Sequence, residues 1–410
     1  MTKRLEKYAS IVGREEINEI ISLADCIRSQ KVQNINSTKN GGGVAEILGC
    51  LIPLFHELEV DISWDVIKGN RDFFEITKTI HNALHGEEVE ISAEILDIYL
   101  DTVASNYNII KKDADFIIIH DPQPIPLIIK RNETEAKWIW RCHIDLTEAD
   151  FRIMGFLWQH ISRFDCSVYH LPNYSTSSFF QDEYIIPPAI DPLHDKNREL
   201  APEEIVHELH SIEIEPDIPI ILQVSRFDRL KDPIGVIRAF NILQNEGINA
   251  QLILAGSSAA DDPEGERVYN EVLDFADNNP VIHILQLPSD SHLKINALQR
   301  AATVVVQKSI REGFGLVVTE AMWKAKPVVG GNVGGIQKQI IHGETGFLVN
   351  TVEGTAYRIQ QLINNPELAK KMGKEARHNV LTNYLMPSLL KNWLLLFLSL
   401  RHKGRGIIHL

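Results

Sequence analysis

The sequence has 410 residues, which is too long for one hydrophobic core and predicts two domains of roughly 190 residues each. Hydrophobic residues make up 44% of the chain and charged residues 23%, a balance that excludes a disordered or fibrous protein. The net charge of -14 at pH 7 argues against nucleic acid or an anionic membrane surface as a partner.

Cysteine spacing and the lack of targeting signals favour a cytoplasmic protein. The four cysteines show no C-x-x-C pair and no dense framework, which is typical of reduced compartments. The N-terminus has no apolar segment of the signal-peptide kind. The longest apolar run, residues 393–400, is far shorter than the roughly 20 residues of a membrane helix, so we expect a buried helix there.

The first half of the chain predicts a doubly wound parallel sheet. A helix is expected over residues 1–30, and later helical stretches alternate with strands. Trp138 and Trp140 share one face of a strand, and core packing is the favoured interpretation for them. The expected strands are residues 31–36, 61–67, 116–120, 138–143, 166–170 and 184–186.

A glycine-rich turn is expected between the first strand and a helix over residues 45–58. Gly41, Gly42 and Gly43 would let the backbone approach a compact ligand without side chains in the way. No Gly-Lys-Ser/Thr follows, so the turn is not a Walker A loop, and it is not a clean dinucleotide fingerprint. An ordinary strand-to-helix turn is the alternative.

Polar residues gather where the expected strands of the first half end. His120 and Asp121 follow one strand, while Arg141, His143 and Asp145 close the next. Ligands of open α/β sheets bind at the carboxyl ends of strands, so this cluster favours a functional role. A structural role is the alternative for each histidine taken singly.

A proline-rich segment, residues 187–192, suits a linker to a second domain. A polar helix is expected over residues 201–210, and helices over about 367–400 are expected to cross back to the first domain. The strands expected in this second half are residues 219–224, 250–255, 281–285, 303–307 and 326–330.

The loop after the first strand of the second half carries two cations. Ser225 and Arg226 leave the strand, and Lys231 follows a few residues later. Arginine binds phosphate oxygens in bidentate fashion and lysine adds a compact charge, so the loop suits a phosphate group. Two solvated cations are the alternative.

The most informative motif is the stretch 309–320, S-I-R-E-G-F-G-L-V-V-T-E. It follows a buried strand, turns at Gly313 and Gly315, and enters a helix whose free N–H groups favour an anion. Glu312 lies in the loop, and Glu320 lies about one turn into the helix on the same side. The alternative is a helix cap with two solvated carboxylates.

These motifs in this order resemble the Glu–seven residues–Glu signature of retaining nucleotide-sugar glycosyltransferases of family 4. In the second half the resemblance covers residues 225–231, 255–256, 309–320, 327–328, 334–335 and 343–347. In the first half, residues 36–46, 120–124, 138–145 and 187–192 are similar to trehalose synthases of the glycosyltransferring type. Such enzymes join a nucleoside-diphosphate glucose to free glucose through an α,α-1,1 bond.

The resemblance implies an α/β fold of two Rossmann-like domains facing across a cleft, the GT-B fold. The acceptor-binding domain is expected to span residues 1–190, joined by a returning helix at about 385–410. The nucleotide-sugar-binding domain is expected to span residues 191–384.

The resemblance also implies roles for particular residues in a retaining glucosyl transfer. The residues expected to act on the reacting groups are Glu312, Arg226, Lys231, His143 and Asp121. Those expected to bind the donor are Ser225, Gly313, Phe314, Gly315, Leu316 and Glu320, with Glu320 on the ribose. Those expected to bind the acceptor are Gly41, Gly42, Gly43, Arg141 and Asp145.

No obligatory cofactor or metal site is expected, with Mg²⁺ at most an accessory. The only D-x-D, residues 113–115, precedes its strand and is badly placed to ligate a diphosphate-bound cation. The expected partners are a nucleoside-diphosphate glucose and glucose, with neither nucleic acid nor membrane, and a homodimer is left open.

Several alternatives also remain open. One is a related transferase with a sucrose-type or glucosylglycerate-type acceptor, and another is a trehalose phosphorylase. A sensor that binds a sugar nucleotide without turnover is the alternative from another class, and the donor base is not readable.

Overall fold

The computed structural model describes residues 3–39, 42–175, 182–256 and 263–402. They divide into two compact units. The first unit comprises residues 1–188 and 386–410, and the second comprises residues 189–385. Among the described residues, no helix combines the length and the apolar character that a membrane span needs.

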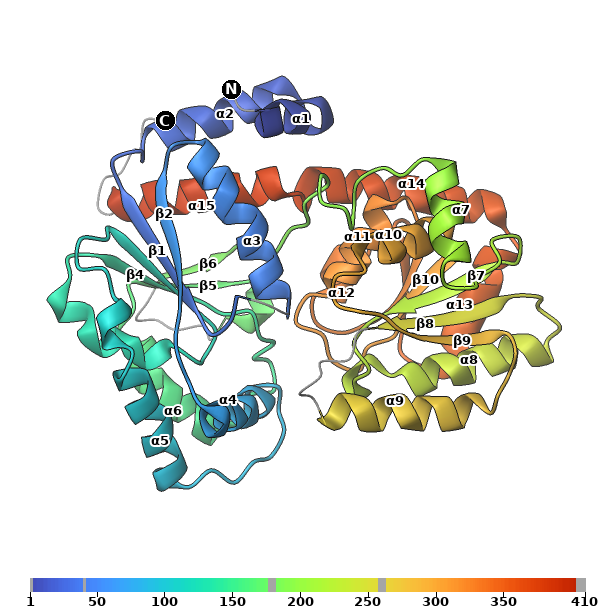
Figure 1. Ribbon diagram of the computed structural model, residues 1–410, viewed down its shortest axis with the longest axis horizontal. Coiled ribbons are helices and arrows are strands. Elements are labelled where there is room, and N and C mark those ends of the chain that lie inside the picture. Colours follow the sequence, from blue (N-terminus) through green and yellow to red (C-terminus); the bar gives the residue numbers. More distant parts are fainter. Residues whose placement is uncertain (1–2, 40–41, 176–181, 257–262, 403–410) are drawn as a thin grey trace. The chain divides into compact units, whose positions relative to one another are not determined.

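The first unit is built on six parallel strands in the order β2-β1-β3-β4-β5-β6 (Figure 1). The strands are β1 Lys31–Asn36, β2 Asp61–Val66, β3 Phe116–His120, β4 Lys137–Arg141, β5 Cys166–Tyr169 and β6 Asp182–Ile185. Strand β3 reads F-I-I-I-H and is buried along its whole length, as expected when helices cover both faces of a parallel sheet. The strand order reverses between β1 and β3, which makes their carboxyl ends the expected ligand-binding edge.

Helices cover both faces of this sheet. They are α1 Lys3–Val12, α2 Arg14–Asp25, α3 Gly42–Glu57, α4 Arg71–Leu84, α5 Ala93–Ala104, α6 Phe151–Ile161 and α15 Met386–Arg401. Single 3-10 turns lie at Tyr107–Ile109 and Pro172–Tyr174, and a longer 3-10 stretch at Ile125–Glu133. Helices α4, α5 and α6 lie on one side of the sheet, and α3 and α15 lie together on the other (Figure 1).

The pleat of the strands sorts the side chains between these two faces. Ile117 and Ile119 point into a core shared with the buried rings of Trp138 and Trp140. The expectation that the two tryptophans are core residues is confirmed. On the other face, Ile118 and His120 look toward α3 and α15, and this face carries the site described below.

The second unit holds another six-stranded parallel sheet, in the order β12-β11-β10-β7-β8-β9 (Figure 1). Its strands are β7 Ile220–Val224, β8 Gln251–Gly256, β9 Ile282–Gln286, β10 Val304–Gln307, β11 Val328–Gly331 and β12 Gly346–Val349. Its helices are α7 Pro202–His210, α8 Pro233–Asn245, α9 Pro263–Ala276, α10 His292–Ala301, α11 Leu316–Trp323, α12 Ile336–Gln339, α13 Val352–Ile363 and α14 Pro366–Asn383, with a 3-10 turn at Arg229–Lys231. The strand order reverses between β7 and β10.

The predicted fold class of two Rossmann-like α/β units is confirmed, and α15 packs on α2 and α3 of the first unit. Three details differ from the prediction. The single N-terminal helix is two helices, because Gly13 adopts a left-handed φ of 95° between them. Helix α3 begins at Gly42 rather than residue 45, and strand β12 was not predicted.

Candidate functional site

The Gly315 turn lies at the strand-order reversal of the second unit. Gly315 caps α11 with a left-handed φ of 85°, a conformation that side chains disfavour. Gly335 backs the turn so closely that a Cβ there would lie 2.4 Å from the Phe314 Cα. The residues 313–316, predicted to bind the donor, therefore form a tightly packed loop that leads into the first turn of α11.

Lys231 and Glu312 meet at this edge of the sheet, although they lie far apart in the sequence. The Lys231 Nζ atom lies 2.7 Å from the Glu312 Oε2 atom, and the Ser309 hydroxyl donates to the same oxygen at 3.2 Å. The Gln223 side chain on β7 donates to the Lys231 carbonyl and so fixes the 3-10 turn that carries the lysine. The structure thus brings together a cation and a carboxylate that were predicted to share the donor site.

Arg226 and Ser225 are placed differently. The Arg226 side chain is 63% exposed, and its guanidinium lies 3.7 Å from the Asp228 carboxylate. Ser225 continues from β7, and its backbone N–H donates to the Ala255 carbonyl. Arg226 is therefore accessible to solvent, whereas Lys231, which was predicted to bind the same diphosphate, is paired with Glu312.

Glu320, which was expected to bind the ribose, is fully buried within the second unit. Its Oε1 atom lies 2.9 Å from the Lys196 Nζ atom, and Gln299 donates to Oε2 at 3.2 Å. Burial alone would raise the pKa of Glu320, but Lys196 and Lys324 together hold it below its ordinary value. In this structure Lys196 covers the carboxylate that was predicted to bind the ribose.

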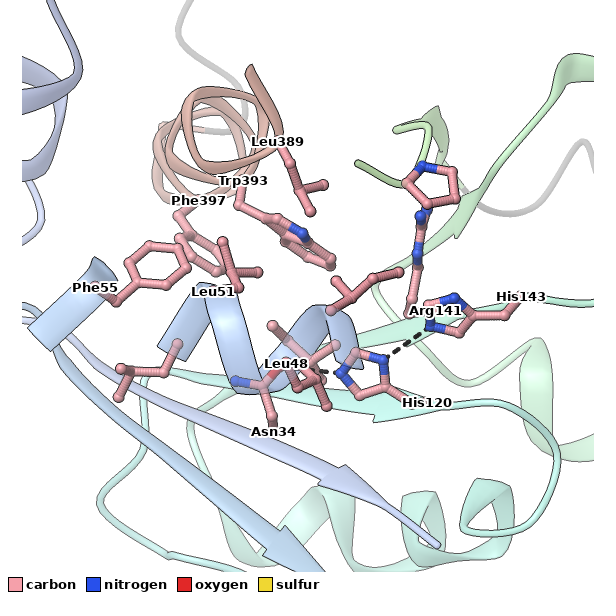
Figure 2. A pocket seen from close by; sticks show the side chains of 14 residues that line it. Asn34, Leu48, Leu51, Phe55, His120, Arg141, His143, Leu389, Trp393 and Phe397 are labelled. Carbon is pink, nitrogen blue, oxygen red and sulfur yellow. Dashed lines mark hydrogen bonds between the residues drawn. The ribbon is translucent and has the colours of Figure 1, made fainter. Parts of the chain in front are cut away.

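Three histidines form a hydrogen-bonded chain across the first sheet. The His120 Nδ1 atom lies 3.1 Å from the His143 Nε2 atom, and the His143 Nδ1 atom lies 3.0 Å from the His170 Nε2 atom. Asn34 on β1 closes one end, with its Oδ1 atom 3.0 Å from the His120 Nε2 atom. Figure 2 shows the part of this chain from Asn34 to His143. The chain joins four neighbouring strands where β3, β4 and β5 end.

Burial keeps the hydrogen-bonded histidines His120 and His143 uncharged. It lowers the pKa of His120 to about 3, and the nearby Arg141 guanidinium acts in the same direction. Burial also lowers the pKa of His143 well below its ordinary value, again assisted by Arg141. Both imidazoles are therefore neutral at physiological pH.

Asp121 follows His120 with a left-handed φ of 61°, and its side chain turns back to the chain of histidines. Its Oδ1 atom accepts a hydrogen bond from the His143 backbone N–H at 2.8 Å. Burial raises the pKa of Asp121 to about 7, against the opposing effects of that hydrogen bond and of Arg141. A carboxyl group with such a pKa can hold or release a proton near neutral pH.

Arg141 was expected to bind the acceptor sugar, but its guanidinium is buried and bound to backbone carbonyls. The residue is 2% exposed, and it donates to the backbone carbonyls of Tyr169 and Ile186 at 3.1 and 2.6 Å. It therefore ties together the ends of β4, β5 and β6. Asp145 is also buried, and its Oδ1 atom accepts from the Thr147 N–H and hydroxyl groups.

Of the three glycines predicted at the acceptor site, Gly41 lies outside the described residues. Gly42 has a left-handed φ of 80° and opens α3, so the turn is shorter than expected. Gly43 is exposed in the first turn of α3. A Cβ at Gly42 would meet no atom within 4 Å, which leaves open space beside the backbone.

A small cavity lies between α3, α15 and the carboxyl half of the first sheet (Figure 2). Leu48, Leu51, Trp393 and other apolar side chains of the two helices form one side. The polar side chains of Asn34, His120, Arg141 and His143 form the other. The chain of histidines is therefore shielded from solvent on this face.

Several residues of these sites were not singled out from the sequence, namely Asn34, His170, Lys196 and Ser309. A usable signal existed for His170, because it follows the end of β5 just as the predicted His120 and His143 stand at or just after the ends of β3 and β4. Among the residues that the structure describes, no group of His, Cys, Asp or Glu side chains is arranged to hold a metal ion.

Two family models match the chain. Residues 34–176 match the model described as trehalose synthase, N-terminal domain, and residues 208–379 match the model of glycosyl transferases group 1. The chain is 40% identical over 396 residues to a trehalose synthase of Pyrococcus horikoshii, covering 96% of this chain and 95% of that protein.

More distant similarities extend this pattern. The chain is 29% identical to a trehalose phosphorylase of Pleurotus pulmonarius, covering 92% of this chain but 58% of the phosphorylase. The solved α,α-trehalose 6-phosphate synthase of Burkholderia multivorans superposes with a TM-score of 0.74 over 92% of this chain and 100% of that chain. At 13% identity this last similarity shows the fold alone.

Proposed function

Because the chain belongs to the trehalose synthase family of glycosyltransferases, we propose that it transfers glucose from a nucleoside-diphosphate glucose to free glucose. The product is α,α-1,1-trehalose, and the anomeric configuration of the donor is retained. The observation that carries the proposal is the Lys231–Glu312 pair beside the first turn of α11. It supplies a cation for a diphosphate and a carboxylate for sugar hydroxyls at one edge of the second sheet.

The donor half of the reaction is assigned to the second unit. Lys231 and the exposed Arg226 neutralise the departing diphosphate, assisted by the backbone N–H groups of residues 313–315. Glu312 accepts hydrogen bonds from hydroxyls of the donor glucose. Glu320 binds the ribose. For this contact the Lys196 ammonium group moves away from the Glu320 carboxylate, which then accepts hydrogen bonds from the ribose hydroxyls.

The acceptor half is assigned to the first unit. The backbone at Gly42 and Gly43 and the Asp121 carboxyl group bind the acceptor glucose, while His143 lies beside the anomeric centre. Arg141 is omitted from this set, because its guanidinium is already bound to two backbone carbonyls.

The proposed step balances without a covalent enzyme intermediate. The bond between the anomeric carbon and the diphosphate oxygen breaks, and a bond forms from that carbon to the acceptor hydroxyl oxygen on the same face. The hydroxyl proton passes to the departing phosphate oxygen, so the products are trehalose and the nucleoside diphosphate.

The test is incubation of the protein with glucose and with the ADP, UDP or GDP derivative of glucose in turn. NMR of the product reads the linkage, and α,α-1,1-trehalose is the expected result. Parallel reactions with EDTA and with added Mg²⁺ show whether the ion is an accessory. Turnover with a phosphorylated or acidic acceptor but not with glucose would assign the chain to a related transferase.

The similarity to a phosphorylase favours one second candidate, the cleavage of trehalose by inorganic phosphate. Incubation with trehalose and phosphate, without any nucleotide, tests it directly. Release of glucose 1-phosphate at a rate above that of the nucleotide-dependent reaction would favour the phosphorylase. The full-length match to the trehalose synthase makes the transferase our first proposal.

A further inference from the structure

The hydrogen-bonded histidines of the first unit have a defined direction. Asn34 sets it, because its amide nitrogen donates to the Ser63 backbone carbonyl at 3.5 Å, and a carbonyl can only accept. The Asn34 side-chain oxygen therefore faces His120 and accepts from the His120 Nε2–H group.

The direction propagates from ring to ring. With its proton on Nε2, a neutral His120 offers Nδ1 as an acceptor, so the proton between the first two rings sits on the His143 Nε2 atom. The His143 Nδ1 atom is then an acceptor, and it receives the His170 Nε2–H group. All three rings are consequently in the Nε2–H tautomer.

We propose that Asn34, His120 and His170 are positioning residues that hold His143 as a neutral imidazole in one tautomer, with both ring nitrogens engaged. This inference rests on the proposed function, in which His143 lies beside the anomeric centre. It changes the expected role of His143, because a ring with both nitrogens engaged neither takes the acceptor proton nor donates one to the leaving group.

A neutral ring suits the chemistry at this position. The anomeric carbon gains positive charge as the diphosphate departs, and an imidazolium cation next to it would oppose that charge. The ionisable groups that face His143 are Arg141, Asp121 and the two other histidines. From α3 and α15, the side chains that line the same cavity are apolar. The surroundings thus disfavour protonation of His143, as its low pKa indicates.

The first test reads the tautomers directly and needs no turnover. The full-length protein is labelled with ¹⁵N on the histidine rings, and the rings are assigned from single histidine variants. We expect Nε2–H signals for His120, His143 and His170, with no titration of His120 or His143 between pH 8 and pH 5.5. An Nδ1–H tautomer, or protonation of His143 in this range, would overturn the proposal whether or not trehalose is formed.

The second test separates positioning from simple packing. In His170→Gln the side-chain amide nitrogen takes the place of Nε2 and still donates to His143, whereas His170→Leu removes the donor. We expect His170→Gln to keep kcat within about threefold of the wild type, and His170→Leu to lose at least about tenfold with a mixed His143 tautomer.

Gln33→Leu is the matched control. Gln33 is fully buried on β1 beside Asn34. Its side-chain nitrogen donates to the Asp65 carboxylate and to the Ile109 carbonyl rather than to a histidine. It should keep the wild-type tautomers and pH profile even if it lowers stability. Equal kcat values for His170→Gln and His170→Leu would count against the positioning role, and absence of trehalose synthesis by the wild type would instead refute the proposed function.

Discussion

Each of the two glutamates that flank the Gly315 turn is paired with a lysine from another part of the second unit. Lys231 neutralises Glu312, and Lys196 neutralises Glu320. Both pairs are mostly shielded from solvent, so each carboxylate has its charge balanced within the protein. A bound sugar nucleotide would offer these carboxylates hydroxyl donors, and its phosphates would draw Lys231 away from Glu312.

We expect Lys231→Ala to lower kcat at least about a hundredfold, because it removes a charge that stabilises the departing diphosphate. The fold should survive with a lowered thermal midpoint, because Glu312 loses the lysine that balances its charge but keeps its hydrogen bond from Ser309. Steady-state kinetics and a melting curve measure both quantities.

Arg229→Ala supplies the control for this variant. Arg229 lies in the same 3-10 turn, but its exposed side chain pairs with Glu271. Its kcat should match the wild type. Wild-type turnover by Lys231→Ala would rule out the assigned role.

The sequence was informative about residues whose position follows from the order of the strands. Lys231 and Glu312 follow β7 and β10, which are neighbours at the strand-order reversal, so their meeting was predictable. Lys196 was not, because nothing in the local sequence indicates that a residue of the linker region reaches Glu320. The burial of Arg141 was equally hidden, since its two acceptors are backbone carbonyls that any residue provides.

At the scale of secondary structure, two elements determine the acceptor side of the first unit. Helix α3 begins at Gly42 next to the carboxyl end of β1, and α15 packs beside α3 although it is the last helix of the chain. The start of α3 was predicted too late because three consecutive glycines are typical of a turn. Helix propensity alone does not show that two of them belong to the first turn of a helix.

Gly42→Val should raise the glucose KM or abolish transfer. Valine is strongly disfavoured at a φ of 80°, so the backbone that opens α3 must move. Affinity for the nucleoside diphosphate should change by less than about threefold, because the residues assigned to that ligand all belong to the other unit. Glucose kinetics and calorimetric titration of the nucleoside diphosphate measure the two effects.

Gly13→Val is the matched control, because Gly13 has a similar φ of 95° and also meets no atom within 4 Å of an added Cβ. It places the same backbone strain between α1 and α2, and we expect the glucose KM to stay at the wild-type value. A collapse of nucleotide affinity in Gly42→Val with an unchanged glucose KM would assign the glycine turn to the donor instead.

Phe397→Ala should lower the free energy of unfolding of the first unit by about 3–5 kcal/mol. The Phe397 ring is fully buried, and its centroid lies 4.8 Å from that of Phe116 and 6.2 Å from that of Phe55. Urea unfolding followed by tryptophan fluorescence measures the loss. Phe151→Ala, at a side chain that is 81% exposed, should change the stability by less than about 1 kcal/mol, and a similar loss in both variants would contradict this account of α15.

At the scale of the whole molecule, burial places ionisable groups with opposite pH dependence in the first unit. His120 and His143 have lowered pKa values, so the unfolded chain binds their protons first and they destabilise the fold as the pH falls below 6.5. Asp121 has a raised pKa of about 7, so the native state binds its proton first and it destabilises the fold as the pH rises from about 4 to 7. The histidines and the carboxyl group therefore oppose each other between pH 7 and pH 5.

Two isosteric variants should separate these contributions when urea unfolding at pH 7 is compared with pH 5. Between pH 7 and pH 5 His120 gains a proton in the unfolded wild type but not in the folded state, where its pKa is about 3, and this difference lowers the stability. His120→Gln removes the titrating group, so it should lose less stability on acidification than the wild type, by about 2 kcal/mol. Asp121→Asn should lose more than the wild type, because the group that gains stability on acidification is removed. Identical pH dependence of the unfolding free energy in all three proteins would show that neither His120 nor Asp121 has the pKa shift assigned to it.

The return of α15 to the first unit also bears on the order in which the protein is completed during synthesis. Residues 1–188 leave the ribosome first, but the helix that covers Phe55 and Phe116 follows only after the whole second unit, residues 189–385. At bacterial and eukaryotic elongation rates, roughly 5–20 residues per second, that delay lasts about 10–40 s. During this interval the nascent first unit lacks the helix that covers these two rings, while the second unit already has every strand and helix that the structure describes in it. The part of the protein that emerges first is therefore the last to finish folding.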